Sequence, residues 1–190
     1  MTISMCAVGP TPPYAGAPRS AQLGTISYYG AMSASELWVE SYQGEVLGEA
    51  LFGALAERES DSSRRHELEV LTLLERATKE LAEPVFEMRK LDHGNTAATL
   101  ATAAELAEAV AGMTWEDFLA SIEPGTEQFR ARYRELVRLA SDHTEREIAE
   151  TYLAHEEALL AFARRSLGRE AGDPLEPVLA LPHVAAAIPT

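Results

Sequence analysis

From about residue 35 to residue 168, the chain consists of long segments rich in Ala, Leu and Glu, separated by short polar or Pro/Gly-containing breaks. These three residue types are strong helix formers. Apolar residues recur in the segments at helical spacing, and they do not alternate with polar ones as in a half-buried strand. The pattern predicts an all-α protein with a single core, which suits a chain of 190 residues.

The breaks set the expected helix boundaries. Ser35 is the expected N-cap of the first helix. Pro84 should kink or split the second helix, and Pro124-Gly125 should end the fourth, because proline removes a helical hydrogen bond. We therefore expect helices at about residues 35–59, 63–89, 96–111, 114–121, 126–140 and 144–167.

The lengths of the connections predict the topology. The breaks near residues 60–63 and 141–144 are short, so each should join antiparallel neighbours. The connection between these two hairpins carries a short helix of its own and is long enough to run back along the bundle. We expect a four-helix bundle of two antiparallel hairpins joined by a long crossover. A helical bundle of other connectivity remains the alternative.

The two ends of the chain differ in texture from the bundle. Residues 1–33 contain four prolines among scattered Gly and Ser, which predicts an extended or disordered arm. Residues 169–190 are also rich in proline and should form a tail that packs on the bundle. The bundle itself is expected to cover residues 34–168.

Charge and composition exclude several classes of function. The formal net charge of −14 argues against binding to nucleic acid or to anionic membranes, which require basic patches. No apolar run approaches the roughly 20 residues that span a bilayer. Cys6 is the single cysteine, which excludes an intrachain disulfide and a cysteine-based zinc site. No secretory signal is recognisable, so a cytoplasmic location is expected.

Polar residues interrupt the apolar stripes of the long helices. On the last helix, His155 lies within about 60° of Tyr152, Leu159 and Phe162, and Glu156 falls inside the wider apolar arc. A buried histidine or carboxylate is costly unless it has a partner. Both side chains are therefore candidates for a polar site inside the bundle.

The first two helices supply candidates at the same height. Glu45 precedes the first tight turn by about as many residues as Glu75 follows it, and each lies on its helix's apolar side. Glu49 lies about 40° from Glu45 and is closer to the edge of the apolar face. The helix expected at residues 126–140, the third of the four bundle helices, contributes Tyr133 to its inward stripe and no carboxylate. Three carboxylates and one imidazole could thus meet near the bundle centre.

In these residues the chain resembles the ferritin-like superfamily, whose bundles hold di-iron or di-manganese carboxylate centres. The resemblance covers about residues 35–168 and is carried by helix order together with Glu45 in YQGEVLGEALF, Glu75 in LLERATK and His155-Glu156 in LAHEEALLAFA. That family uses a Glu from each of two helices and a Glu-x-x-His pair from each of the other two.

This sequence departs from the family pattern at three positions. Thr78 stands where the histidine three residues after Glu75 is expected, and Tyr152 stands where a glutamate should precede His155. Tyr133 replaces the glutamate of the third helix. The resemblance therefore implies an altered site, with one ion favoured over two.

The reduced ligand set would be Glu45, Glu75, His155 and Glu156. Three oxygen donors and one nitrogen suit iron, manganese or zinc, and the resemblance implies iron or manganese. The residues expected to line the site are Glu49, Thr78, Lys79, Tyr133 and Tyr152.

Simpler interpretations of the same residues stay open. His155 could be a hydrogen-bonded core histidine, and Glu75 could pair with Lys79 on the helix surface. Tyr133 and Tyr152 could be core aromatics with satisfied hydroxyl groups. The remaining histidines fall at expected helix ends, in a loop and in the tail, and none suggests a site: His66, His93, His143 and His183.

Two functions follow from these alternatives. The first is a non-haem metal-dependent oxidase or oxygenase acting on a small molecule. The second is a metal-free binding or interaction protein that keeps a buried polar network and forms a homo-oligomer, with a homodimer favoured. No phosphate-binding glycine loop, nucleophile elbow or HExxH motif points to another reaction.

Overall fold

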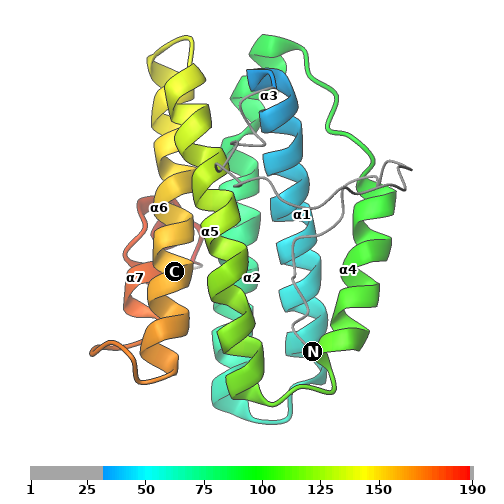
Figure 1. The fold of residues 1–190 in the computed structure, drawn as a ribbon, viewed down its shortest axis with the longest axis vertical. Helices are drawn as coiled ribbons and strands as arrows, with labels where there is room; N and C mark the ends of the chain where they lie inside the picture. The colour runs from blue at the N-terminus through cyan, green and yellow to red at the C-terminus, as the bar shows by residue number, and fades with distance from the viewer. Residues whose placement is uncertain (1–31, 189–190) are drawn as a thin grey trace, which may run out of the picture.

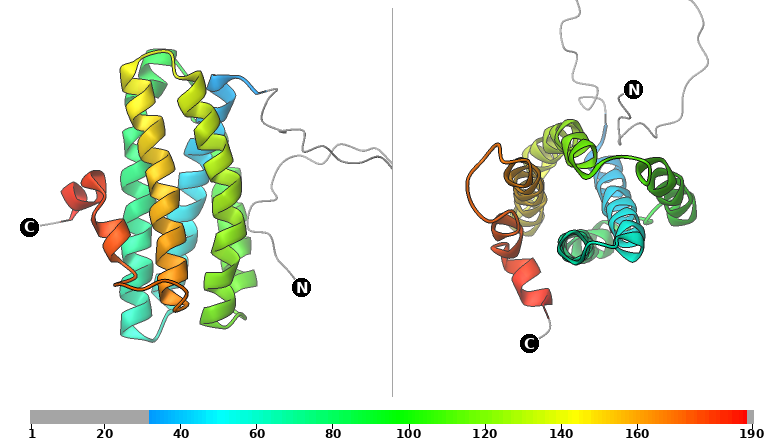
Figure 2. Two further views of the ribbon diagram at one scale, coloured as in Figure 1. Left: turned by 60° about the vertical axis from the view of Figure 1, so that its left-hand side comes forward. Right: turned by 90° about the horizontal axis from the view of Figure 1, so that it is seen from below.

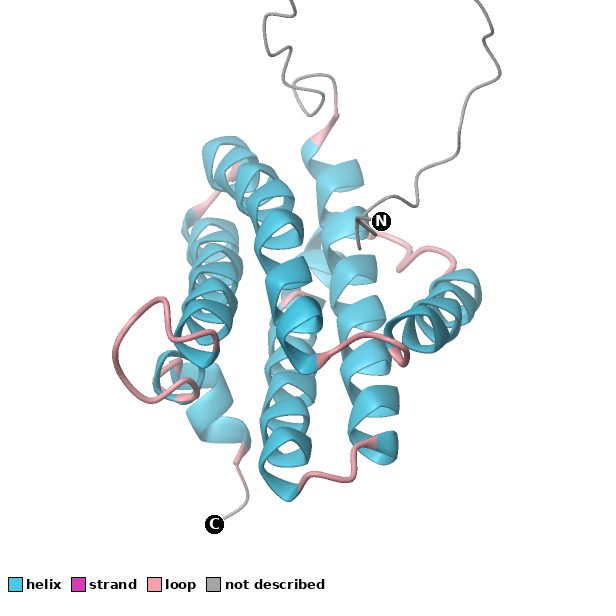
Figure 3. Ribbon diagram, turned by 60° about the horizontal axis from the view of Figure 1, so that its bottom comes forward, coloured by secondary structure: helices cyan, strands magenta, loops and turns pink. Residues whose placement is uncertain are grey.

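The structure of the protein, a computed structural model, describes residues 32–188, and the regular elements within this range are all helices (Figures 1 and 3). The predicted all-α class is confirmed. The expected N-terminal arm, including Cys6, lies outside the described residues except for its last two positions. The helices are α1 (Ala34–Arg58), α2 (Ser62–Leu81), α3 (Glu83–Arg89), α4 (Thr96–Val110), α5 (Trp115–Leu139), α6 (His143–Ser166), α7 (Glu176–Leu179) and α8 (Pro182–Ala187).

Four long helices surround the centre of the molecule. α1 packs against α2 and α5 packs against α6, each pair joined by a short turn (Figure 1). In the same view the chain descends in α1, ascends in α2 and α5, and descends again in α6. The crossover between the pairs carries α4, which packs on the outer side of α1 (Figure 2).

Side-chain caps explain where the long helices begin. Ser33 accepts a hydrogen bond from the backbone of Glu36, whose carboxylate in turn accepts one from the backbone N–H of Ser33 at 2.8 Å. This capping box starts α1 two residues before the predicted cap. The side chains of Asp61, Asn95 and Asp142 cap α2, α4 and α6 by accepting hydrogen bonds from backbone N–H groups of the first turn.

The two interior prolines behave differently. Pro84 separates α3 from α2, as the sequence predicts. The prediction that Pro124-Gly125 would end a helix is wrong, because α5 continues through both residues to Leu139. Buried side chains lie on both sides of the proline, among them Ile122 and Thr126. Their burial outweighs the roughly 3 kcal/mol that an interior proline costs.

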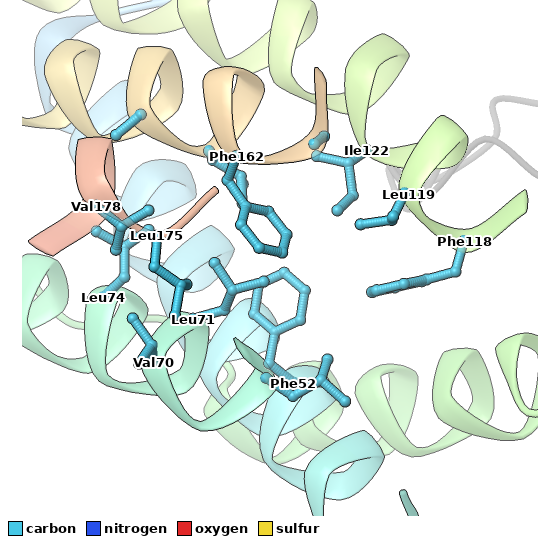
Figure 4. Packing of buried hydrophobic residues seen from close by; sticks show 14 of the residues in the cluster. Phe52, Val70, Leu71, Leu74, Phe118, Leu119, Ile122, Phe162, Leu175 and Val178 are labelled. Atoms are coloured by element: carbon cyan, nitrogen blue, oxygen red, sulfur yellow. The ribbon is translucent and has the colours of Figure 1, made fainter. Parts of the chain in front are cut away.

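Two apolar clusters fill the bundle, one toward each end. One contains Phe52, Leu71 and Phe162 (Figure 4). The other contains Trp38, Phe86 and neighbouring residues at the opposite end of α1 and α6. The middle of the long helices, between the two clusters, is where the candidate site residues lie.

The C-terminal segment covers one side of the bundle. Its short helices α7 and α8 pack on α6 and α2 (Figure 2). Val178 and Val184 are fully buried there, and Val178 belongs to the cluster drawn in Figure 4. The proline-rich tail is therefore an ordered part of the core. Among the described helices, none has both the length and the apolar composition needed to cross a membrane.

Candidate metal centre

Glu45, Glu75 and His155 meet in the middle of the bundle, contributed by α1, α2 and α6 respectively. His155 Nδ1 lies 3.2 Å from Glu45 Oε2, and His155 Nε2 lies 3.4 Å from Glu75 Oε1. One donor atom from each of the three residues lies within 4.8 Å of the other two. All three side chains are almost fully buried. Their burial agrees with the inward positions that helical periodicity predicts for these three residues.

Glu156 occupies a neighbouring position. It is buried and borders the same cavity as Glu45 and Glu75. Its carboxylate is not part of the mutually close group of donor atoms found in the described chain. Glu156 therefore lies beside Glu45, Glu75 and His155 and does not join them in a four-residue cluster.

Burial shifts the protonation equilibria of these groups. Burial, together with the charge of Glu45, raises the pKa of Glu75 to about 8 despite the opposing effect of His155. Burial also raises the pKa of Glu156 well above its ordinary value. Burial alone would lower the pKa of His155, but the charges of Glu45 and Glu75 outweigh it and raise that pKa well above 6.5. The centre therefore favours a positive charge surrounded by carboxyl groups.

Thr78 holds the imidazole ring from the side of α2. Its hydroxyl lies 3.0 Å from His155 Nδ1 and 2.9 Å from Nε2 of His183 on α8. His183 belongs to the tail, where the sequence suggests no site. The only sequence signal is Pro182, a residue favoured in the first turn of a helix. That signal could indicate a short helix but not where it docks.

The two inward tyrosines lie side by side. Tyr133 donates a hydrogen bond to Glu45 Oε1 at 2.9 Å, and its ring packs edge-on against Tyr152 with centroids 5.1 Å apart. The hydroxyl of Tyr152 is buried and has no hydrogen-bond partner in the described chain. Burial raises the pKa of both phenols well above 10, so both remain protonated.

Glu49 and Lys79 form a separate pair. Lys79 donates to Glu49 across the α1–α2 contact, and Arg76 donates to the same carboxylate at 2.7 Å. The side chains of Glu49 and Lys79 are about one fifth exposed, at 20% and 22%. A surface pair between Glu75 and Lys79 is contradicted, since Lys79 binds Glu49 and Glu75 points inward.

A glycine on α1 makes room for Glu75. A Cβ added at Gly48 would lie 2.3 Å from Glu75 Oε2 and 2.4 Å from its Cδ, closer than any real contact. The Glu75 carboxylate therefore rests directly on the backbone of α1. The GEVLGE spacing shows two glycines one turn apart, but the sequence does not reveal which side chain from α2 fills the space.

A cavity of about 570 Å³ leads to these carboxylates from the region between α1, α4 and α5. Such a volume is within the range of small-molecule sites. Glu45, Glu75, Glu156 and Tyr133 form its inner end, and most of the remaining wall is apolar. The candidate centre thus has a route by which a ligand could reach it.

Comparisons of the chain with models of known protein families, with curated proteins and with solved structures gave no match.

Proposed function

We propose that the protein is a ferritin-like bundle that binds one iron or manganese ion through Glu45, Glu75 and His155. In this proposal it acts as a non-haem metal-dependent oxidase or oxygenase on a small molecule. The observation that carries the proposal is the convergence of three buried donor residues from three helices, within 4.8 Å of one another. Helix order and the crossover support the assignment to the superfamily.

The residues present fit a metal ion. Glu45 Oε2 and His155 Nε2 are both buried and make no well-aligned hydrogen bond in the described chain, their charged neighbours lying at 3.2 and 3.4 Å, and a bound cation would satisfy both. Three carboxyl groups, including Glu156, surround a single imidazole, so the centre is rich in oxygen atoms that could become ligands on losing a proton. Oxygen donors with one nitrogen suit iron or manganese.

The neighbouring side chains orient these donors. Tyr133 holds Glu45 through Oε1 and leaves Oε2 available. Thr78 engages His155 through Nδ1 and leaves Nε2 available. Outer hydrogen bonds of this kind fix the ring orientation and tautomer of metal-binding histidines.

Thr78 and Tyr152 also favour one ion over two. They stand where the two-ion pattern has ligands, and neither belongs to the close donor group. A bound iron or manganese ion would supply one-electron redox chemistry. The chain's part is to hold the ion, keep the Tyr133 and Tyr152 phenols protonated, and surround the centre with apolar walls.

Metal analysis tests this proposal. Protein produced with supplementary iron or manganese should hold about one ion per chain, as expected for a single built site. Glu45→Gln and His155→Gln should each reduce the metal content to nearly zero. Glu49→Gln is the matched control, since Glu49 lies one turn from Glu45 but pairs with Lys79. Wild-type protein without metal, or a loss equal in the control, would contradict the proposal.

One observation favours a second candidate. His155 contacts a carboxylate through each ring nitrogen, so a protonated imidazole also balances the charge of Glu45 and Glu75. The chain would then be a metal-free binding or interaction protein, for which we infer a homodimer. A wild-type protein free of metal, with His155→Gln strongly destabilised and no change in metal content, would support this candidate.

A further inference from the structure

The cavity that ends at the candidate centre is lined mainly by three helices, and α2 and α6 add Glu75, Glu156 and Leu159. α1 contributes one side, α4 and its preceding loop a second, and α5 a third. Gly44, Gly48 and Gly125 lie along it, so little side-chain volume separates the helices there. The apolar wall residues include Leu47, Leu51, Phe52, Ile122, Phe129 and Leu159.

The hydroxyl groups in the wall are already bonded within the protein. Thr102 and Thr126 each donate to the backbone carbonyl four residues earlier, at 3.1 and 2.9 Å. Ser121 donates to the carbonyl three residues earlier, at 2.6 Å. Their donor hydrogens therefore point along their own helices and are not directed at a ligand.

The larger polar side chains of the wall are also engaged. The amide of Gln43 donates to the backbone carbonyl of His93 and accepts from Thr99, which ties α1 to the start of α4. Arg132 lies 3.3 Å from Glu40 and stacks over the ring of Phe129, with 4.6 Å between the guanidinium carbon and the ring centroid. The one basic residue of the wall thus faces a carboxylate of its own chain.

Within the described wall, the inner end offers an anion no unpaired positive group. Its acidic side chains are Glu45, Glu75 and Glu156, and the imidazole of His155 beside them already lies 3.2 Å from Glu45 and 3.4 Å from Glu75. A cationic ligand would have to compete with the metal ion for the same oxygens. Recognition by the outer wall rests on apolar contact and shape.

We propose that this cavity binds an uncharged, predominantly apolar small molecule. Its binding follows from the wall alone, whereas its role as substrate rests on the proposed metal-dependent function. A molecule with a hydrocarbon body can occupy the apolar wall while one end reaches toward Glu45 and Glu75.

A matched pair of ligands tests the chemistry. 2-Naphthalenemethanol and 2-naphthoate share one ring system and differ in charge. Calorimetric titration of the chelator-treated protein should show the neutral alcohol binding about tenfold or more tightly than the carboxylate, because burying an unpaired charge is costly. Its binding should also have a negative heat-capacity change.

Two variants on α4 test the location. Thr102→Trp fills the cavity and should weaken binding of the alcohol by about tenfold or more, since the added ring occupies the ligand's space. Ala101→Trp adds the same side chain at an exposed position of α4 outside the wall and should leave affinity unchanged. Ala98→Trp, at the exposed edge of the wall, replaces Thr102→Trp if that variant is unfolded.

The proposal is overturned by any of three results: no binding of the alcohol up to its solubility limit, tighter binding of the naphthoate, or unchanged affinity in the wall-filling variant. Since the titration uses metal-free protein, it is independent of metal content. Binding of the alcohol by a wild-type protein that never takes up metal would support the cavity and reject the metal-dependent reaction.

Discussion

The Glu75 carboxylate lies where a side chain at position 48 would begin, with Oε2 only 2.3 Å from the position of a Cβ on Gly48. A methyl group added at Gly48 on α1 would collide with this carboxylate. It should therefore displace Glu75, a candidate metal ligand on α2. No other part of the described site depends so directly on the absence of a side chain.

Gly48→Ala should therefore displace Glu75. We expect metal affinity to fall about 10- to 100-fold, the size of effect seen when the surroundings of a metal ligand are altered. Stability should fall by about 1–3 kcal/mol from overpacking. Metal titration and urea unfolding measure the two effects.

Gly53→Ala is the matched control on the same helix. Its new Cβ would lie 3.7 Å from Thr72 Cγ2, an ordinary contact. Since alanine is the better helix former, stability should rise by about 0.5–1 kcal/mol with metal affinity unchanged. Equal behaviour of the two variants would refute the role assigned to Gly48.

Metal affinity should increase as pH rises from 6 to 8. The pKa of Glu75 is about 8 and that of His155 lies well above its ordinary value of 6.5, so both proposed ligands hold protons that a metal ion must displace. Calorimetry in buffers of different ionisation enthalpy should show proton release on binding. The release should decrease in Glu75→Gln, and an affinity independent of pH would contradict the prediction.

Docking of α8 should weaken in acid. Burial and the charge of His155 lower the pKa of His183 to about 4 from its ordinary value of 6.5. Between pH 6.5 and pH 4, His183 binds a proton in the unfolded chain but stays neutral in the folded chain. The free energy of unfolding should therefore decrease as pH falls from 6.5 toward 4.

His183→Gln measures that contribution. The variant removes the titrating group, and it should lose about 0.5–1.5 kcal/mol at pH 7 if the contact with Thr78 is not replaced. The difference in melting temperature between the wild type and the variant should shrink from pH 7 to pH 4. A constant difference across this range would show that His183 does not titrate as proposed.

The ion pair between Arg89 and Glu145 should stabilise the end of the bundle distant from the C-terminal helices. Burial would raise the pKa of Glu145, but hydrogen bonds from Arg89 and Ser141 hold it at about 2. Its contribution is present above about 4.5 and is lost as pH falls toward 2, since the unfolded carboxyl group protonates first.

Arg89→Gln should cost about 1.5–3 kcal/mol at pH 7, because Glu145 is fully buried and loses a charged donor. Arg138→Gln is the control: its partner Glu135 lies three residues away and the arginine is two-thirds exposed, so the change should be small. Urea unfolding at pH 7 and pH 3 should show a smaller deficit at the lower pH.

Helical periodicity predicts the inward positions well because it depends only on residues within one segment. The positions of Glu45, Glu75 and His155 relative to the tight turns predict that they lie at similar heights along the bundle, because each turn sets the register of its own hairpin. The convergence across the two hairpins follows from burial of their apolar stripes.

Contacts between distant segments were harder to predict. Pro124 is a helix breaker by local preference, and only the burial of its neighbours on α5 reverses that preference. His183 reaches Thr78 over 105 residues of sequence, through a helix too short to have a readable period. Lys79 had partners of opposite charge on two helices, and local spacing alone could not decide between Glu75 and Glu49.

The layer of Glu45, Glu75 and His155 between two apolar clusters also restricts how the helices can slide. A shift of α6 by one turn past α1 and α2 would carry His155 into an apolar cluster and leave Glu45 and Glu75 facing Tyr152 or Leu159. Apolar residues alone tolerate such a slip, because one leucine can replace another. The polar layer therefore opposes misregistered packing of the long helices, because a shifted arrangement buries two carboxyl groups and an imidazole without their partners.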